Sequence, residues 1–287
     1  MKIGYIGLGT MGQRIAVHLA KNKKLTVYNR TIAKAKWFAN NFNSKCVSSI
    51  KELCDQSNII FLCLQNDQAV TSVMKEIFEH AKIGTIIIDN STIDHQLAIK
   101  LYSQAKDIKI NYLDAPINAG RKEAEQGELA SSVGGDEDIF NKVKHLIKLY
   151  SNSVNYMGQA GNGQLTKITN LIVAFGIKQG LIEGLQFANT FGLDRKKLVE
   201  VLLNGSSASH QAQRHAGSIV KNELKEKIIT PGTIETAQLA LKNIKSKNNI
   251  IIYFFIEIKY LLVHYLLLLP LYLLLRINLM NLQMFLL

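Results

Sequence analysis

The chain has 287 residues, 47% hydrophobic and 20% charged, which excludes a disordered protein and leaves room for one large domain or two ordinary ones. The formal net charge is +12, but the basic residues are scattered and form no block interleaved with aromatics. This favours anionic small molecules as partners and argues against nucleic acid.

The N-terminal half alternates strand-like and helix-like segments. Residues 2–7 form a short apolar run with no cleavage site after it, so no signal peptide is expected. Met11, Ile15 and Leu19 then recur at helical spacing. Further strands are expected over 25–29, 58–64, 85–89, 109–116 and 153–158. The alternation predicts an α/β domain with a mostly parallel sheet over residues 1–160.

Three cysteines lie in this half: Cys46, Cys54 and Cys63. They form no Cys-x-x-Cys pair, so we expect neither a disulfide framework nor a metal site. A reducing, cytoplasmic location fits this use of cysteine best.

After Gly161 the pattern becomes helical. Residues 161–194 lack proline and predict one long, mostly apolar helix. A further helix is expected over 194–205, with Asp194 as its N-cap and Gly205 as its stop. Small residues recur every four positions along the long helix: Gly176, Gly180, Gly184 and Ala188. Because a glycine costs roughly 1 kcal/mol inside a helix, this stripe predicts close approach of another backbone, at a subunit interface or within the domain.

Residues 248–287 differ from the rest of the chain. They are rich in leucine, isoleucine and aromatic residues, and their only acid is Glu257. They follow "KNIKSKNN", whose codons could be adenine-rich, where a reading frame slips easily. A frameshifted tail therefore ranks first, a membrane anchor around 260–275 second and a buried native helix third. A frameshift would leave an incomplete all-α second domain over residues 161–247.

The stretch "YIGLGTMG", residues 5–12, carries the pattern G-x-G-x-x-G between a predicted strand and a predicted helix. In that context Gly7 permits the turn, Gly9 lets the backbone approach a pyrophosphate, and Gly12 allows close helix–strand packing. The free N–H groups at the helix N-terminus favour the anion. The predicted cofactor residues here are Gly7, Leu8, Gly9, Thr10, Met11 and Gly12.

The second strand ends in Asn29, Arg30 and Thr31. An Asp or Glu there would bind the ribose 2′-hydroxyl of NAD, whereas an amide, a guanidinium and a hydroxyl suit a 2′-phosphate. The sequence therefore predicts NADP, with NAD still possible. The alternative is that Arg30 is a solvated loop residue.

Four blocks in order resemble the β-hydroxyacid dehydrogenase family, which includes 3-hydroxyisobutyrate dehydrogenase and the tartronate semialdehyde and glyoxylate/succinic semialdehyde reductases. They are "GYIGLGTMGQRIAVHLA", "DAPINAGRKEAEQGELA", "GNGQLTKITN" and "LALKNIK", and they cover roughly residues 1–245. The resemblance implies a Rossmann-type, doubly wound sheet, as in 6-phosphogluconate dehydrogenase, followed by an all-α domain. It also implies an active site in the cleft between them, a small carboxylate substrate and, if the C-terminal domain is intact, a homo-oligomer.

By the same resemblance, Lys167 matches the family's catalytic lysine and Asn170 its orienting asparagine. The chemistry agrees, because hydride transfer from an alcohol needs a group that takes the hydroxyl proton. A lysine buried on an apolar helix can have its pKa lowered enough to do so. The alternative is a lysine that extends to solvent from a surface helix.

The resemblance also assigns the substrate carboxylate to the loop "DAPINAG", where the family has D-A-P-V-S-G-G. Asn118 takes the serine position, Ala119 takes the first glycine, and Gly120 is retained. An amide can still donate a hydrogen bond to a carboxylate. The departures therefore bear on substrate identity more than on reaction type.

Further cofactor residues are expected at the ends of two strands and near the C-terminus: Leu64, Gln65, Asn66, Thr92 and Lys242. In the family the position of Thr92 lies beside the nicotinamide ribose. Lys242 matches a second family lysine, although Asn243 replaces the aspartate that follows it, and an ordinary helix-face charge is the alternative.

These features predict an NAD(P)-dependent oxidoreductase that transfers a hydride between NADP(H) and a small β-hydroxy acid or its semialdehyde, with Lys167 as general acid/base. The residues 248–287 keep two alternatives open. One is a catalytically impaired NADP-binding protein, and the other is a membrane-tethered reductase.

Overall fold

The computed structural model describes residues 1–221. Contacts divide the chain into two compact units, the first from Met1 to Leu171 and the second starting at Ile172. Each unit is described by itself. Lys242 and residues 248–287, with the alternatives raised for them, lie outside the described residues.

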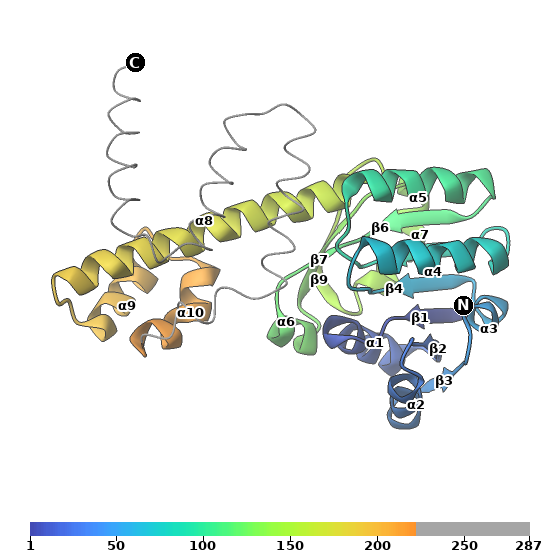
Figure 1. The fold of residues 1–287 in the computed structure, drawn as a ribbon, viewed down its shortest axis with the longest axis horizontal. Helices are drawn as coiled ribbons and strands as arrows, with labels where there is room; N and C mark the ends of the chain where they lie inside the picture. Colours follow the sequence, from blue (N-terminus) through green and yellow to red (C-terminus); the bar gives the residue numbers. More distant parts are fainter. Residues whose placement is uncertain (222–287) are drawn as a thin grey trace, which may run out of the picture. The chain divides into compact units, whose positions relative to one another are not determined.

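The first unit is built on a six-stranded parallel sheet (Figure 1). Its strands are β1 Ile3–Ile6, β2 Leu25–Tyr28, β3 Ser44–Cys46, β4 Ile59–Leu62, β5 Ile86–Asp89 and β6 Asn111–Asp114. They lie in the order β3-β2-β1-β4-β5-β6. From β1 the successive strands are added on one side up to β3 and on the other side from β4, which is the strand order of a Rossmann sheet. The predicted α/β, Rossmann-type fold is confirmed.

Helices cover both faces of this sheet. They are α1 Thr10–Asn22, α2 Ile32–Asn41, α3 Ile50–Gln56, α4 Asp67–His80, α5 His95–Asp107, α6 Arg121–Gln126 and α7 Glu137–Ile147. Ile59 and Phe61 of β4 belong to the buried cluster of α1, α2 and α7. Ile60 and Leu62 belong to the cluster of α3, α4 and α5. Successive side chains of a strand point to opposite faces, so a strand covered on both sides needs a continuous apolar run.

A second, three-stranded sheet lies in the same unit. Its strands are β7 Ile117–Asn118, β8 Leu129–Val133 and β9 Ser151–Tyr156. β7 pairs antiparallel with β8, and β8 pairs parallel with β9. The strand predicted at 153–158 corresponds to β9, whereas β3, β7 and β8 were not predicted. β8 reads "LASSV", and its buried Ser131 hydroxyl bonds the Ser151 hydroxyl at 2.8 Å, a pairing that apolar periodicity does not reveal.

The long helix α8, Asn162–Thr190, begins against the end of β6. The buried Asp114 carboxylate accepts the N–H of Gly161 at 2.8 Å and the N–H of Gln164 at 2.9 Å. A Cβ at Gly163 would lie 2.6 Å from the Ser132 carbonyl oxygen, so glycine is needed at this contact. Asp114 thus satisfies N–H groups that the start of a helix leaves without intrahelical partners.

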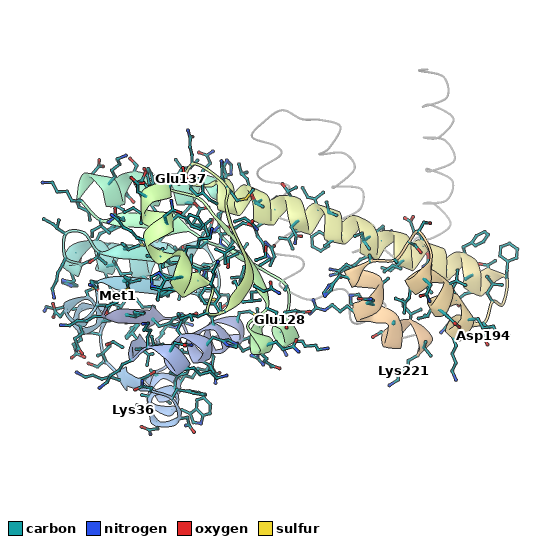
Figure 2. The ribbon with its side chains drawn as sticks, turned by 180° about the vertical axis from the view of Figure 1, so that it is seen from behind. Met1, Lys36, Glu128, Glu137, Asp194 and Lys221 are labelled. Atoms are coloured by element: carbon teal, nitrogen blue, oxygen red, sulfur yellow. The ribbon has the colours of Figure 1, made fainter. Side chains whose placement is uncertain are left out.

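The second unit contains the rest of α8, then α9 Arg195–Asn204 and α10 His210–Val220. The Asp194 side chain accepts N–H groups of the first turn of α9, and Gly205 ends that helix, as predicted. Among the described residues of this unit, one buried residue from each helix belongs to a shared hydrophobic cluster: Leu185, Val199 and Ile219. Figure 2 labels Asp194 at the start of α9 and Lys221 just after α10.

The small-residue stripe of α8 does not meet the expected neighbour within residues 1–221. A Cβ built at Gly176, Gly180 or Gly184 would have nothing within 4 Å, so the predicted close approach of a backbone is not found there. Ala188 is buried, at 3% exposed. By length and composition α8 would also suit a membrane span, a test that core helices of soluble proteins pass equally.

Replacing the Asp114 carboxylate tests how much the fold depends on it. In Asp114→Asn only one side-chain oxygen remains for the N–H groups of Gly161 and Gln164, so one of them loses its acceptor. We expect unfolding free energy to fall by about 2–4 kcal/mol in urea titrations, because an unsatisfied buried N–H and a lost charged acceptor both cost energy. The exposed Asp107→Asn is the control, with a change within about 0.5 kcal/mol. Equal effects of the two substitutions would show that Asp114 is not the anchor.

Candidate functional site

The loop after β1 is shaped by its three glycines in different ways. Gly7 has φ +99°, and a Cβ there would overlap the Cys63 carbonyl oxygen. A Cβ at Gly12 would overlap the carbonyl oxygen of Gly7. Gly9 has nothing within 4 Å of its Cβ position and directly precedes α1, whose first turn holds no acid. Packing therefore requires Gly7 and Gly12, while Gly9 borders open space beside helix N–H groups that suit a pyrophosphate.

Asn29 ties this loop to the end of β2. Its side-chain oxygen accepts the Leu8 N–H at 2.9 Å, and its amide nitrogen donates to the Thr31 carbonyl oxygen at 3.1 Å. The side chain predicted to meet the cofactor phosphate is thus already used to shape the loop. Arg30 and Thr31 are exposed just before α2, where a ribose 2′-phosphate could reach them.

The residues expected at the ends of β4 and β5 lie at the same edge of the sheet. The Leu64 N–H donates to the Ser91 hydroxyl at 2.9 Å, which joins the two loops. Asn66 caps α4 by accepting the Ala69 N–H at 2.9 Å, and Gln65 beside it is exposed. Sheets of this kind bind nucleotides at the carboxyl ends of their strands, at the point where the strand order reverses.

Lys167 and Asn170, in the first turns of α8, contact β7, the strand that follows β6 along the chain. The Lys167 ammonium donates to the Ile117 carbonyl oxygen at 2.8 Å. Burial lowers the pKa of Lys167 to about 8. The Asn170 amide donates to the Asn118 side-chain oxygen at 3.1 Å. The structure thus brings together, within the first unit, the predicted lysine, the predicted orienting asparagine and the loop predicted to bind the substrate.

Gln164 connects the two sides of the site. Its side chain is fully buried, and it accepts the Ile93 N–H at 3.1 Å and donates to the Ser91 carbonyl oxygen at 2.9 Å. These two backbone groups flank Thr92, the residue expected beside the nicotinamide ribose. Because Gln164 precedes Lys167 by one helical turn, it holds the cofactor-side loop against the helix that carries the lysine.

One hydrogen-bond donor of the predicted carboxylate loop is already bonded within the protein. The Gly120 N–H donates to the Glu123 carboxylate at 2.8 Å, so it is not among the donors left for a substrate. Asn118, whose side-chain oxygen is bound to Asn170, keeps its NH2 group as a donor. Ala119 has φ +107°, a conformation that L-residues rarely adopt.

Sequence reasoning missed the residues that hold the site together: Asp114, Gln164, Ser91 and Glu123. Asp114 and Gln164 stand within the quoted blocks "DAPINAG" and "GNGQLTKITN", but a role for either depends on contacts between segments far apart in the chain. A polar residue that directly follows an apolar strand, or that starts an apolar helix, was the available signal.

Comparisons with known proteins agree with this architecture. Residues 2–158 match the family model described as the NAD binding domain of 6-phosphogluconate dehydrogenase. The chain is 37% identical over 218 residues to an uncharacterised oxidoreductase of Shewanella frigidimarina, covering 74% of each. It is 30% identical over 225 residues to the 2-hydroxy-3-oxopropionate reductase of Escherichia coli, covering 77% of this chain and 76% of that one.

A solved structure shows the same fold. It is 3-hydroxyisobutyrate dehydrogenase of Mycobacterium tuberculosis with L-serine, which superposes with a TM-score of 0.77 at 22% identity. The superposition covers 86% of this chain and 87% of that one.

The glycine loop gives a matched pair of variants. Gly9→Ala has room for its methyl group and an extended backbone (φ −75°), so we expect an unchanged melting temperature. Because the methyl group would stand where the pyrophosphate approaches the backbone, NADPH binding should weaken by about tenfold, or ~1.4 kcal/mol. Gly12→Ala should lower the melting temperature because its methyl group meets a carbonyl oxygen. Thermal unfolding and NADPH fluorescence titration measure both. Unaltered binding by the Gly9 variant would exclude this loop as the pyrophosphate site.

Proposed function

The chain belongs to the β-hydroxyacid dehydrogenase family and is an NAD(P)-dependent oxidoreductase, and we propose that it transfers a hydride between NADP(H) and a small β-hydroxy acid or its semialdehyde. The observation that carries the proposal is Lys167. Its pKa lies near 8, and its ammonium lies on the substrate loop. Its helix is bonded through Gln164 to the loop at Thr92.

In this proposal Lys167 moves the proton that accompanies the hydride. A bound NADP would supply the hydride acceptor for oxidation of the alcohol carbon and the hydride donor for reduction of the carbonyl carbon. In oxidation neutral Lys167 takes the hydroxyl proton as the C–H electrons leave, and in reduction its ammonium gives a proton to the carbonyl oxygen. Asn170, bonded to Asn118, orients the reacting oxygen beside the lysine.

The substrate class follows from the loop beside Lys167. The Asn118 amide and the backbone at Ala119 offer hydrogen-bond donors to a carboxylate, and the +12 net charge favours an anionic substrate. The name of the E. coli relative describes a three-carbon acid with an aldehyde group, which supports the same class.

NADP is the preferred cofactor in this proposal. Arg30 and Thr31 lie exposed where β2 ends, and no Asp or Glu stands there to bind a ribose 2′-hydroxyl. A guanidinium and a hydroxyl at this point suit the 2′-phosphate. The same loop without its phosphate contact would still accept NAD.

The function is tested by NADPH oxidation with a panel of short semialdehydes: glyoxylate and the tartronate, succinic and methylmalonate semialdehydes. We expect Lys167→Ala to lower kcat for the best substrate by at least ~100-fold, because a general acid typically contributes that much. Lys142→Ala, exposed on α7, is the charge-matched control and should keep full activity.

The pH profile identifies Lys167 as the group concerned. Because its pKa is lowered to about 8, reduction should slow as pH rises through that value, while oxidation should accelerate. Both limbs should vanish in Lys167→Ala. A limb near the ordinary lysine pKa of about 10.4, or activity that survives the substitution, would contradict the mechanism.

Cofactor preference depends on Arg30. Arg30→Asp removes a phosphate contact worth roughly 1.5–3 kcal/mol and adds repulsion, so kcat/KM for NADPH should fall by at least about tenfold while that for NADH holds or rises. Lys23→Asp, exposed just after α1 and before the amino end of β2, makes the same charge change away from the carboxyl end of that strand and controls for net charge. If both variants keep the NADPH/NADH ratio of the parent, the 2′-phosphate lies elsewhere.

A further inference from the structure

The substrate loop contains a conformation that its own residue disfavours. Two non-glycine residues among the described ones have positive φ, Lys109 at 58° and Ala119 at 107°. The first value lies in the left-handed helical region, which side chains tolerate, whereas the second lies well outside it. Such a conformation persists only where its surroundings hold it, and it is typical of ligand-binding loops.

The loop is held on its N-terminal side by strand pairing and by α8. Ile117 and Asn118 of β7 pair with Ser131 and Ala130 of β8. Asn118 also accepts the amide of Asn170. The chain that enters Ala119 is therefore fixed in position.

On its C-terminal side the loop is held by Glu123. The Glu123 carboxylate accepts the Gly120 N–H at 2.8 Å, and the Gly120 carbonyl oxygen accepts the Ala124 N–H at 3.0 Å. A carboxylate acceptor makes the first of these bonds stronger than a neutral one. The peptide that leaves Ala119 is thus tied to the first turn of α6.

α6 is itself docked on α1. Arg14 and Glu125 form an ion pair at 2.8 Å, and the His18 ring bonds the Ala124 carbonyl oxygen at 2.9 Å. Glu123 therefore acts from a helix that is anchored to the Rossmann framework, and not from a free loop. Figure 1 shows α6 beside α1, and Figure 2 labels Glu128, which follows α6.

We propose that Glu123 is a positioning residue, which holds the Asn118–Gly120 loop in its substrate-binding conformation by bonding the Gly120 N–H. The inference rests on the proposed function, because the loop is the one assigned to the substrate carboxylate. Glu123 touches neither substrate nor cofactor in this role. It keeps Ala119 at positive φ, so that the Ala119 N–H and the Asn118 amide meet the substrate in a fixed arrangement. A loop released from this bond would have to be ordered by the substrate, which raises KM.

A competing account assigns Glu123 the opposite effect. A carboxylate that accepts the hydrogen bond of the Gly120 N–H could stand where the substrate carboxylate would bind and inhibit its binding. Removing it would then lower KM. The direction of the KM change separates the two accounts.

The test compares Glu123→Ala, Glu123→Gln and the control Glu128→Ala, which is exposed just beyond α6. For the best semialdehyde we expect Glu123→Ala to raise KM about tenfold with kcat and the KM for NADPH little changed. Glu123→Gln keeps an acceptor oxygen and should restore KM to within about threefold of the parent. Glu128→Ala should match the parent.

The strain at Ala119 gives a second comparison. Glycine adopts φ +107° without cost, so in an Ala119→Gly background the loop needs the bond less. There, Glu123→Ala should raise KM by no more than about threefold. Non-additivity of this kind is expected for residues that act on one conformation and not for independent sites.

Hydrogen exchange of the peptide 117–124 tests the positioning independently of turnover. Its amides should exchange faster in Glu123→Ala than in the parent or in Glu123→Gln, whatever substrate the enzyme uses. A parent that reduces no semialdehyde but shows this exchange pattern contradicts the proposed function while keeping the loop contact. Unchanged exchange, a lower KM in both Glu123 variants, or a loss of kcat alone would overturn the positioning role.

Discussion

A buried carboxylate at the end of β6 fixes the helix on which the site depends. Burial raises the pKa of Asp114 to about 7, and its bonds from the N–H groups of Gly161 and Gln164 oppose that rise. A buried carboxylate without partners would be costly, and a helix start leaves N–H groups unsatisfied. Their pairing offsets part of both costs, but only at close range. A Cβ at Gly134 or Gly163 would lie 2.6 or 2.7 Å from a carboxylate oxygen.

The rest of the site is built outward from that anchor. Gln164 uses its backbone to bind Asp114 and its side chain to bind the loop on either side of Thr92. One turn later Lys167 reaches the Ile117 carbonyl oxygen, and Asn170 reaches Asn118. The loop at Thr92, the lysine and the Asn118–Gly120 loop proposed to bind the substrate are therefore all connected to one short stretch of helix. A shift of α8 would move all three together.

What could be predicted from the sequence was what short-range patterns determine. The glycine loop, the strands that are continuously apolar and the cap at Asp194 each depend on residues close in the chain. β8 and Gln164 could not be predicted in this way, because β8 is defined by pairing with β9 and Gln164 by a loop 71 residues earlier. Asn29 shows an intermediate case: its position was identified, but its side chain supports the loop backbone.

Burial shifts the pKa values of Asp114 and Lys167 toward neutral pH from opposite sides. Burial acts on both groups, raising the pKa of the carboxyl to about 7 and lowering that of the lysine to about 8. An ion pair between them would return the lysine pKa toward about 10.4 and keep the lysine protonated at neutral pH. The carboxylate instead binds N–H groups at the start of α8, and among the described residues desolvation alone accounts for the lysine shift. With its pKa lowered to about 8 by burial, the lysine is able to gain and lose a proton near neutral pH.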